Sequence, residues 1–592
     1  PSSPTITDYD VLDRAKSTTL PDGTTTTMDY GFGKDAAGQQ RFQTIVTDAN
    51  GNIKQSFRDV RELITSVVEE NRPFDNSGKA VSLGKVKIAT RYVYDPLKQI
   101  TQVIDYNNNI TNVSYDNLGR RTVIDNPDTG KTETVYDDAS NPIKKITAKL
   151  RKTGQAIEYD YDHSRLIAIR HPLYPDANVS YTYGTDADRA LNQAGRIKRV
   201  THQSGSEVRE YGMLGETVKE TLTLTAAANG GSTPPVYTTQ YDFDSFGRLH
   251  TLTLPDNEVI TNHYDSGGNL NAVDGTLNGR PYPYLQRLDY DRFESRIYLK
   301  VGNGVETQYS YDPKNRRLAN LQSGSPGKNP MQDMAYSYDA VGNIQSLIDS
   351  APIPKTNEYG GQSTQHFHYD DLYRLVKADG VYTTAREVQN YDVAMAYTPI
   401  HNISHKTQLH TVSKIGGAPR TEAATSYDWA YTYRDRNHPQ PHAPTHIGER
   451  SFDYDKNGNQ SGWQSDDNGS RRVIVWDEDN RIREVQDPKH GAAFTYDDQG
   501  ERKLRKSQYG EVAYINQFFS VRNGAIASTH VYAGSSRIVT KVGAGTPVGK
   551  SANLKGTGNL STSTPTGGDI VVGDVTGGTS TTTTAGATQF TP

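Results

Sequence analysis

The sequence has no cysteine and little tryptophan or phenylalanine. Its 592 residues include 0 Cys, 3 Trp and 13 Phe. The lack of cysteine excludes disulfides, cysteine-ligated zinc, iron–sulfur clusters and thiol nucleophiles. No stretch approaches the roughly 18 apolar residues that a membrane-spanning helix needs. The absence of long apolar runs also disfavours a doubly wound α/β domain, whose buried strands are apolar throughout.

Neither sign of charge dominates the chain. Lys and Arg number 64 against 69 Asp and Glu, for a net charge of −5. There is no global basic field to attract nucleic acid or acidic membranes, so neither partner is expected. Since the chain begins at Pro1 without an initiator Met or a signal peptide, we expect it to be processed or part of a longer protein.

Tyrosine is the abundant large side chain. There are 38 Tyr although only 34% of the residues are hydrophobic. Disordered chains lack aromatic residues, so this composition predicts an ordered protein. A buried Tyr still requires water or a hydrogen-bond partner for its hydroxyl group, which suits thin layers better than a thick core or a helical bundle.

A repeat of about 21 residues runs through the chain. Tyr is followed directly by Asp 16 times. The intervals from Tyr94 to Tyr115, from Tyr115 to Tyr136 and from Tyr290 to Tyr311 are each 21 residues. Trp476 occupies the Tyr position of one copy. Such internal periodicity is the signature of a repeat architecture.

Each repeat carries the pattern of a strand followed by a tight turn. In several copies a Gly stands four residues after the Tyr, as in Tyr115-Asp-Asn-Leu-Gly119. The pattern predicts a strand that ends at Tyr, an Asp that accepts turn amides, and a Gly with positive φ. Asp13, Lys98 and Asn480 take the Gly position in other copies.

The residues expected to define the repeat structurally share these two positions. They are Tyr94, Tyr115, Gly119, Tyr136, Gly247, Tyr264, Gly268, Tyr311, Tyr338, Gly342, Tyr369, Tyr454, Gly458, Trp476, Tyr496 and Gly500.

A second turn signal, such as Leu20-Pro-Asp-Gly23, leaves strands of about five or six residues, so each repeat is expected to be one β-hairpin. Hairpins that stack side by side predict an all-β fold: a long, spiralling antiparallel sheet over residues 1–540. The alternative is a β-propeller, whose repeats run about 40–50 residues. The segment 59–71 could be confused with a helix, but its Val and Ile content favours a long hairpin.

The motif Tyr-Asp-x-x-Gly-[Asn/Arg] resembles that of the RHS/YD-repeat proteins, over roughly residues 1–540. The segments Tyr514–Gly524 and Arg537–Lys541 resemble the late part of the large RHS proteins related to insecticidal Tc toxins (the TcB/TcC-like and polymorphic-toxin proteins). The resemblance implies a sheet that forms a hollow shell around a C-terminal toxin domain. It implies encapsulation of cargo rather than chemistry on a diffusible substrate.

The C-terminal part departs from that family. Residues 541–592 are rich in Gly, Ser and Thr, which predicts a linker or an irregular loop segment. The family's closing segment, with its Asp-Pro-x-Gly autocleavage signature, has no match here. No protease aspartates can therefore be assigned, and the chain is expected to be a shell portion without its cargo.

Candidate chemical sites are weak. The spacing of His438, His442 and His446 could gather metal ligands, but Pro439, Pro441 and Pro444 exclude a helix through them, so loop histidines are expected instead. Asp beside Gly invites a calcium site, but the nonapeptide calcium repeat is absent. No nucleophile elbow or phosphate loop is present. We expect no catalytic residue, no metal site and no cofactor.

The sequence therefore predicts a non-enzymatic encapsulation component of a bacterial toxin. Its expected partners are a C-terminal toxin cargo outside this chain and other toxin-complex or secretion-system components. It is expected to be secreted, or cytoplasmic before export. A polar, mixed-charge wall suits an unfolded guest, because no concentrated apolar pocket is indicated. The alternative is a cell-surface adhesin whose exposed Tyr rows bind carbohydrate.

Overall fold

The described part of the chain consists almost wholly of strands. The structure, a computed structural model, describes residues 4–81, 84–225, 234–356, 358, 360–435 and 438–544. These contain 45 strands, one four-residue helix (α1, Ala148–Arg151) and two 3-10 turns (Pro175–Ala177 and Asp186–Leu191). No helix among them is long and apolar enough to cross a membrane. The prediction of an all-β chain is confirmed.

The chain folds as two units, and each unit combines two parts that are far apart in the sequence. Unit 1 contains residues 1–156 and 308–472, and unit 2 contains residues 157–307 and 473–592. In each unit we call the first part in sequence the early strip and the other the late strip. Two strands, β25 (Glu306–Tyr311) and β38 (Arg471–Trp476), run across unit boundaries.

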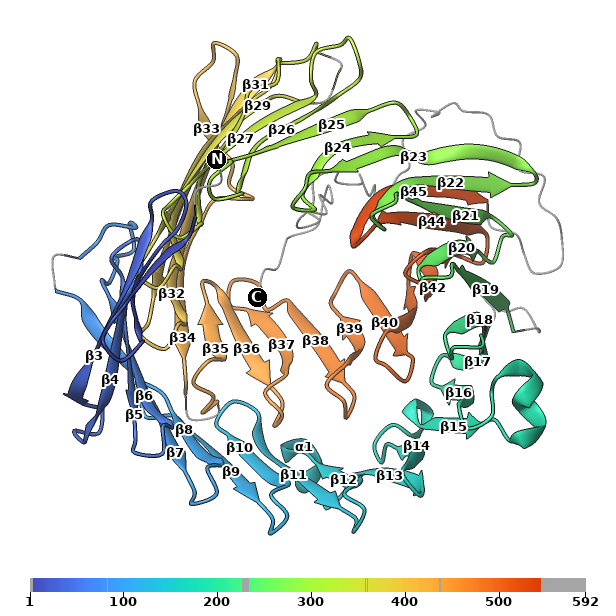
Figure 1. The fold of residues 1–592 in the computed structure, drawn as a ribbon, viewed down its shortest axis with the longest axis horizontal. Coiled ribbons are helices and arrows are strands. Elements are labelled where there is room, and N and C mark those ends of the chain that lie inside the picture. Colours follow the sequence, from blue (N-terminus) through green and yellow to red (C-terminus); the bar gives the residue numbers. More distant parts are fainter. Residues whose placement is uncertain are drawn as a thin grey trace. The chain divides into compact units, whose positions relative to one another are not determined.

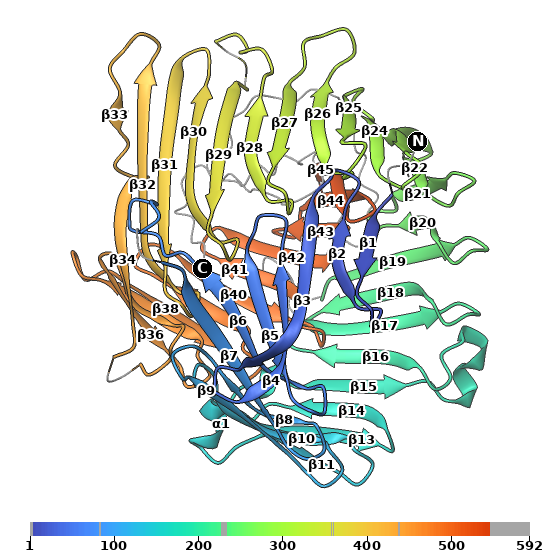
Figure 2. The ribbon, with the colours of Figure 1, turned by 60° about the vertical axis from the view of Figure 1, so that its left-hand side comes forward.

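Unit 1 has the dark-blue to light-blue strands of Figure 1 as its early strip and the yellow-green to light-orange strands as its late strip. The early strip contains β1 (Ile6–Tyr9), β2 (Ala15–Thr19), β3 (Thr25–Lys34), β4 (Gln40–Thr47), β5 (Ile53–Arg58), β6 (Ile64–Asn71), β7 (Val86–Tyr94), β8 (Ile100–Ile104), β9 (Ile110–Tyr115), β10 (Arg121–Asn126), β11 (Gly130–Tyr136) and β12 (Pro142–Ile146). The late strip contains β26 (Leu318–Gly324), β27 (Gln332–Tyr338), β28 (Ile344–Asp349), β29 (Gln362–Tyr369), β30 (Leu375–Thr383), β31 (Glu387–Tyr397), β32 (Ile403–Lys414), β33 (Arg420–Thr421), β34 (Tyr427–Tyr433), β35 (Pro444–Ile447), β36 (Arg450–Tyr454) and β37 (Gln460–Ser465). Figure 2 shows β27 to β32 side by side.

Unit 2 is built in the same way. Its early strip contains β13 (Ile157–Asp162), β14 (Arg165–Arg170), β15 (Val179–Tyr183), β16 (Ile197–His202), β17 (Gly205–Tyr211), β18 (Thr217–Leu224), β19 (Val236–Phe243), β20 (Leu249–Thr253), β21 (Val259–Tyr264), β22 (Leu270–Leu277), β23 (Arg280–Tyr290) and β24 (Arg296–Val301). Its late strip contains β39 (Ile482–Gln486), β40 (Gly491–Tyr496), β41 (Arg502–Ser507), β42 (Gly510–Asn516), β43 (Phe519–Arg522), β44 (Ile526–Ala533) and β45 (Ser536–Ala544).

Consecutive strands pair antiparallel as hairpins. From Tyr115 to Tyr136 the chain forms β10 and β11, so one 21-residue period supplies two strands and two turns, as predicted. In the early strip of unit 1 each strand from β1 to β12 pairs with the next. This run is far longer than a four-stranded blade, so the propeller alternative is wrong.

A β-bulge recurs beside the repeat Tyr. Tyr115 pairs with Arg121 while Ser114 pairs with Val123, which leaves Thr122 as the extra residue. The same shift occurs beside Tyr94, Tyr136, Tyr264, Tyr338, Tyr369, Tyr454, Trp476 and Tyr496. Because a bulge increases the local right-handed twist, every repeat adds twist to its strip.

The ambiguous segment 59–71 contains strand β6 and no helix. Ile64, Thr65, Val67 and Val68 lie in the strand, and a turn at 59–63 that contains Val60 joins β5 to β6 in one hairpin. The expected hairpin is therefore confirmed.

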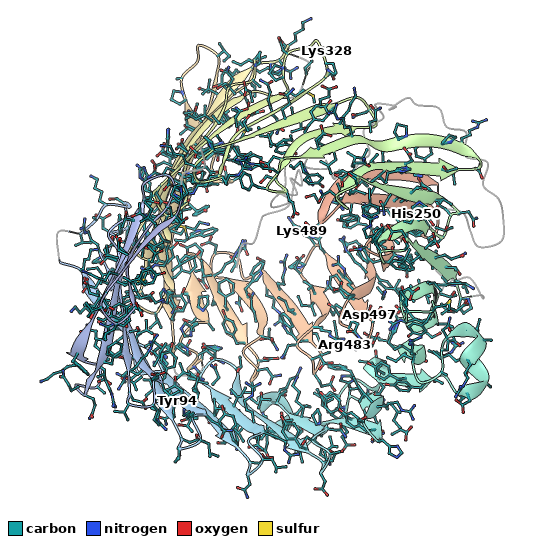
Figure 3. The ribbon with its side chains drawn as sticks, in the orientation of Figure 1. Tyr94, His250, Lys328, Arg483, Lys489 and Asp497 are labelled. Atoms are coloured by element: carbon teal, nitrogen blue, oxygen red, sulfur yellow. The ribbon has the colours of Figure 1, made fainter. Side chains whose placement is uncertain are left out.

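Burial alternates along the strands, since successive side chains point to opposite faces of a sheet. In β44 every second residue is buried. Leu285, Leu288 and Leu299 are almost fully buried in unit 2. Tyr rings contribute to these thin cores: Tyr94 (Figure 3) is half-buried and its hydroxyl donates to the carbonyl oxygen of Ile64 at 2.9 Å.

The last described strand, β45, continues to Ala544, four residues beyond the expected end of the repeat region. The Gly/Ser/Thr-rich segment from 545 onward lies outside the described residues.

Candidate functional site

The Tyr of each predicted repeat, and Trp476 in its place, is the last residue of a strand. The hydroxyl group reaches the neighbouring strand: Tyr264 donates to the carbonyl oxygen of Leu249, the first residue of β20, at 2.8 Å. Equivalent bonds to the preceding strand join Tyr115 to Ile100, Tyr136 to Arg121, Tyr338 to Leu318, Tyr369 to Ile344, Tyr454 to Pro444 and Tyr496 to Ile482. The ring thus covers the sheet while its polar end stays satisfied.

The Asp that follows closes the turn, which we call the repeat turn. One carboxylate oxygen of Asp116 accepts the amides of Leu118 at 3.0 Å and Arg120 at 2.9 Å. The other accepts Nε of Arg120 at 2.7 Å. Desolvation alone would raise the pKa of Asp116, but these hydrogen bonds outweigh it and lower the pKa below its ordinary value. The carboxylate therefore acts as a turn anchor in its charged form.

The predicted glycines adopt the left-handed conformation that the repeat turn requires. Their φ values are +79° at Gly119, +74° at Gly247, +89° at Gly268, +110° at Gly342, +83° at Gly458 and +88° at Gly500. The expected substitutes also have positive φ, with +57° at Asp13, +69° at Lys98 and +62° at Asn480. Backbone geometry thus explains the pattern of residues at this position.

Two copies depart from the common form. The turn after Tyr311 is one residue longer, and its positive φ falls on Arg316 rather than on a Gly. After Trp476 the anchor Asp477 is buried, and it accepts the amides of Asp479 and Arg481 at 3.0 and 2.8 Å. Burial raises the pKa of Asp477 despite these bonds.

An arginine at the end of the repeat turn joins one repeat to the next through its contact with the following repeat Tyr, which we call the relay. The sequence analysis missed this role. Arg120 donates to the carbonyl oxygen of Asp137 at 2.7 Å, and its guanidinium lies 4.9 Å from the ring centre of Tyr136. The same ring contact joins Arg14 to Tyr30, Arg248 to Tyr264, Arg317 to Tyr338, Arg374 to Tyr397 and Arg481 to Tyr496. The signal was the Arg-or-Asn preference after the Gly.

Within unit 1 the late strip binds the early strip along a seam. Turns at the other end of the early-strip hairpins, which we call far turns, meet repeat turns of the late strip. Asn50 donates to Asp339 at 2.9 Å across 289 residues of sequence. His442 donates its amide to Asp128 at 2.9 Å and places Nδ1 2.7 Å from the same carboxylate.

The seam of unit 1 also explains one predicted glycine. A Cβ on Gly458 would lie 2.5 Å from the carbonyl oxygen of Asp128. Its neighbour Asn457 accepts the amide of Lys149 at 2.9 Å. Gly458 therefore serves both the turn and the close approach of the early strip.

Unit 2 has a seam of the same kind, in which a far turn of the early strip meets a repeat turn of the late strip. The fully buried Glu478, in the repeat turn after Trp476, accepts the amides of Leu173 and Tyr174 at 2.5 and 3.1 Å. Arg483 (Figure 3) pairs with Asp176 at 2.8 Å. The partners are again about 300 residues apart, with 305 between Glu478 and Leu173.

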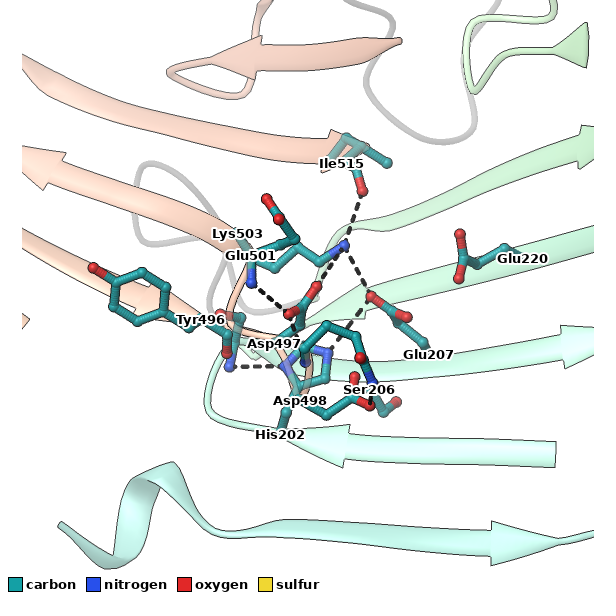
Figure 4. A network of polar contacts seen from close by, with 12 residues as sticks. His202, Ser206, Glu207, Glu220, Tyr496, Asp497, Asp498, Glu501, Lys503 and Ile515 are labelled. Atoms are coloured by element: carbon teal, nitrogen blue, oxygen red, sulfur yellow. Dashed lines mark hydrogen bonds and ion pairs between the residues drawn. The ribbon is translucent and has the colours of Figure 1, made fainter. Parts of the chain in front are cut away.

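A buried charge network lies in the seam of unit 2 (Figure 4). Nζ of Lys503 in the late strip is 3.0 Å from Glu207 in the early strip, 3.3 Å from Asp497, and 3.2 Å from the carbonyl oxygen of Ile515. Arg209 adds a second cation, 3.1 Å from Glu207. Lys503 and Glu207 are 8% and 2% exposed, so both buried charges depend on their ion-pair partners in this network for compensation.

The environment sets the charge states of this network. Burial would raise the pKa of Glu207, but the neighbouring His202 and Lys503 lower it overall. Burial would lower the pKa of Lys503, and the carboxylates of Glu207 and Asp497 raise it instead. Burial and the charge of Glu207 raise the pKa of Glu220. The Lys503–Glu207 pair is therefore ionised at neutral pH.

A second buried carboxylate joins the strips of unit 2 near β45. Glu258 is fully buried and accepts hydrogen bonds from Tyr282 and Tyr284 of its own strip. From the late strip it binds Lys541 and accepts a 3.4 Å hydrogen bond from Thr529. These contacts are structural ties, since all partners come from strand interiors of the two strips.

The histidine cluster does not assemble into a metal site in the described residues. His438, His442 and His446 each contact a different aspartate: Asp435, Asp128 and Asp466. Among the residues that the structure describes, no three His, Asp or Glu side chains are grouped to hold a metal ion. His446 lies in strand β35, so the expectation of loop histidines is wrong for this residue.

Comparison with known proteins finds toxin subunits. No protein-family profile matches the chain. Toxin subunit YenC2 of Yersinia entomophaga is 28% identical over 210 residues, which cover 33% of this chain and 21% of that subunit. Toxin subunit YenC1 of the same organism is 27% identical over 206 residues, covering 33% and 19%. The chain thus spans about a fifth of the length of these relatives.

Solved structures share the fold. The crystal structure of TcdB2-TccC3 matches 91% of this chain with a TM-score of 0.74 and 19% identity, and the match covers 29% of that chain. The Photorhabdus luminescens Tc holotoxin pore matches 91% with a TM-score of 0.67 and 20% identity, covering 28% of that chain. Together these matches confirm the resemblance to RHS/YD-repeat proteins of the Tc-toxin type.

Replacing Tyr264 by Phe should destabilise its hairpin by about 1 kcal/mol, because the carbonyl oxygen of Leu249 loses one of its two side-chain donors and keeps only the amide of Asn262 at 2.9 Å. Native-state hydrogen exchange of β20 and β21 measures this. The control Tyr509→Phe removes the hydroxyl of an exposed ring and should leave exchange unchanged. Equal effects of the two changes would contradict a role for the repeat hydroxyl.

Replacing Lys503 by Met should weaken the seam of unit 2 by about 3 kcal/mol, because it removes the cation beside the buried Asp497 and leaves Glu207 with Arg209 in place of two cations. Hydrogen exchange of residues 473–544 reports the loss. The control Lys506→Met, on the same strand, removes a half-exposed partner of Glu511 and should cost less than about 1 kcal/mol.

The same pair gives a pH dependence. Since the pKa of Glu207 is lowered on folding, its contribution is present above the ordinary glutamate value of 4.5 and disappears as the pH falls through the folded pKa. Glu207→Gln should remove this acid sensitivity. An unchanged acid transition in that variant would contradict the assignment.

Proposed function

We propose that this chain forms part of the wall of a hollow β-shell in a secreted Tc-type toxin, and that the shell encloses and protects a C-terminal cytotoxic domain. The seams carry this proposal. In each unit the late strip returns to bind the early strip after about 300 residues, through contacts such as Asn50–Asp339 and Glu478–Leu173. A sheet that binds its own earlier part builds a wall in layers rather than an open ribbon.

The similarity to known proteins supports the proposal. The fold match to TcdB2-TccC3 covers 91% of the chain, and the sequence relatives are toxin subunits. The partners that we propose are a cytotoxic cargo outside the described residues and further subunits of the toxin complex. The wall acts by isolation, so we propose no enzymatic role for it.

The buried ties across the seams suit this role. Buried charge pairs such as Lys503–Glu207 add little stability compared with apolar contacts, but they are strongly unfavourable when misaligned. They therefore favour one register of late strip on early strip. A wall needs this property, because a slipped register would leave gaps.

A protease-protection experiment on the complete toxin tests the function. The cargo domain should resist added protease in the intact assembly and become sensitive when Lys503→Met and Glu258→Gln together loosen the seam of unit 2. The control Lys506→Met should preserve protection, because its ion pair is half-exposed. Cargo that is digested equally in all three assemblies would defeat the container proposal.

A further inference from the structure

The repeat turns of the early strips expose large apolar side chains. In unit 1 the exposed fractions are 100% at Val11, 67% at Leu12, 99% at Val60, 74% at Leu97 and 71% at Leu118. We call these five residues the rim of unit 1.

Unit 2 has the same feature. Its exposed fractions are 90% at Met213, 88% at Leu214, 81% at Phe246 and 56% at Phe293. These four residues, the rim of unit 2, come from three repeat turns of one early strip. Single exposed apolar residues are ordinary, but their recurrence at the two middle positions of several repeat turns in one strip indicates a contact surface.

The late strips show what this position does. Leu118 stands third after Tyr115, and Phe246 third after Phe243, which ends β19 in place of a repeat Tyr; both lie in the middle of the turn. In the late strips five polar residues stand second or third after the repeat Tyr or Trp476, and each bonds across a seam. They are Asp371, Asn457, Glu478, Asp479 and Asp498. The middle of a repeat turn is therefore the place where one strip meets the far turns of another.

We propose that the rims are docking edges for the far turns of another YD-repeat sheet in the complete toxin. The rim lies on the same kind of edge that forms the seams, so the interface would continue a contact already made inside each unit. The chain spans only 21% of YenC2 and 29% of the TcdB2-TccC3 chain, which leaves room for further repeats in such assemblies. Because the rims are apolar, the docked far turns must present apolar residues rather than the Asp and Asn of the seams.

The absence of cysteine in this sequence makes the rim directly testable. Leu214→Cys and Phe246→Cys place single thiols on the rim of unit 2, and His250→Cys places a control thiol on an exposed strand face of the same strip (Figure 3). Each is labelled with a maleimide in the isolated chain and in the complete toxin, with other cysteines replaced by serine. Rim labelling should fall by about tenfold or more on assembly, since a buried thiol reacts only through local opening, while the control stays unchanged.

The partner is identified by a photoactivated cross-linker attached at Leu214→Cys. Cross-links to far turns of a separate YD-repeat sheet support the proposal. Equal labelling rates in chain and toxin would overturn it, and so would cross-links to a second copy of this chain or to a domain without repeats. The inference rests on the proposed function in one respect, because the experiment compares the isolated chain with the complete toxin. Cargo protection is read separately, so either idea can fail without the other.

Discussion

The carboxylate of the repeat Asp is the interaction on which the rest of the structure depends. Asp116 accepts two backbone amides and a side-chain donor, from Leu118 and Arg120, and Asp10, Asp244 and Asp370 accept the same three hydrogen bonds in their turns. Fixing the turn fixes the bulge beside Tyr115 and the direction in which Arg120 leaves the turn. From there Arg120 contacts Tyr136 and the carbonyl oxygen of Asp137 in the next repeat. The conformation of one turn therefore helps to position the next repeat along the strip.

A chain with so few apolar residues holds its strips together by polar and charged contacts. The seams use carboxylates against backbone amides, as at Glu478, and compensated charges, as at Lys503. Such contacts specify register more than they add stability, since desolvation offsets much of their attraction. Tyr rings cover the thin sheet without leaving polar atoms unsatisfied. The repeat turns, the relay contacts between repeats and the seams between strips are thus all held by polar or charged groups.

The repeat allowed much of this to be predicted. Tyr-Asp-x-x-Gly contains the strand end, the turn anchor and the positive φ in five residues, and even the substitutes at Lys98 and Asn480 were identified. The seams could not be predicted, because Asn50 and Asp339 come together only through the accumulated twist of many repeats. The relay was missed because Arg120 contacts a neighbouring repeat, whereas the motif was interpreted within a single one.

Hydrogen exchange of an Arg317→Gln variant tests the relay most directly. The Arg317 guanidinium donates forward to the next repeat, to the carbonyl oxygens of Asp339 at 2.7 Å and Ala340 at 3.0 Å, and lies over the ring of Tyr338. If repeats are linked in this way, exchange should accelerate in residues 338–343 while the variant's own turn at 312–316 stays protected. Faster exchange confined to 312–316, or no change at 338–343, would contradict the account.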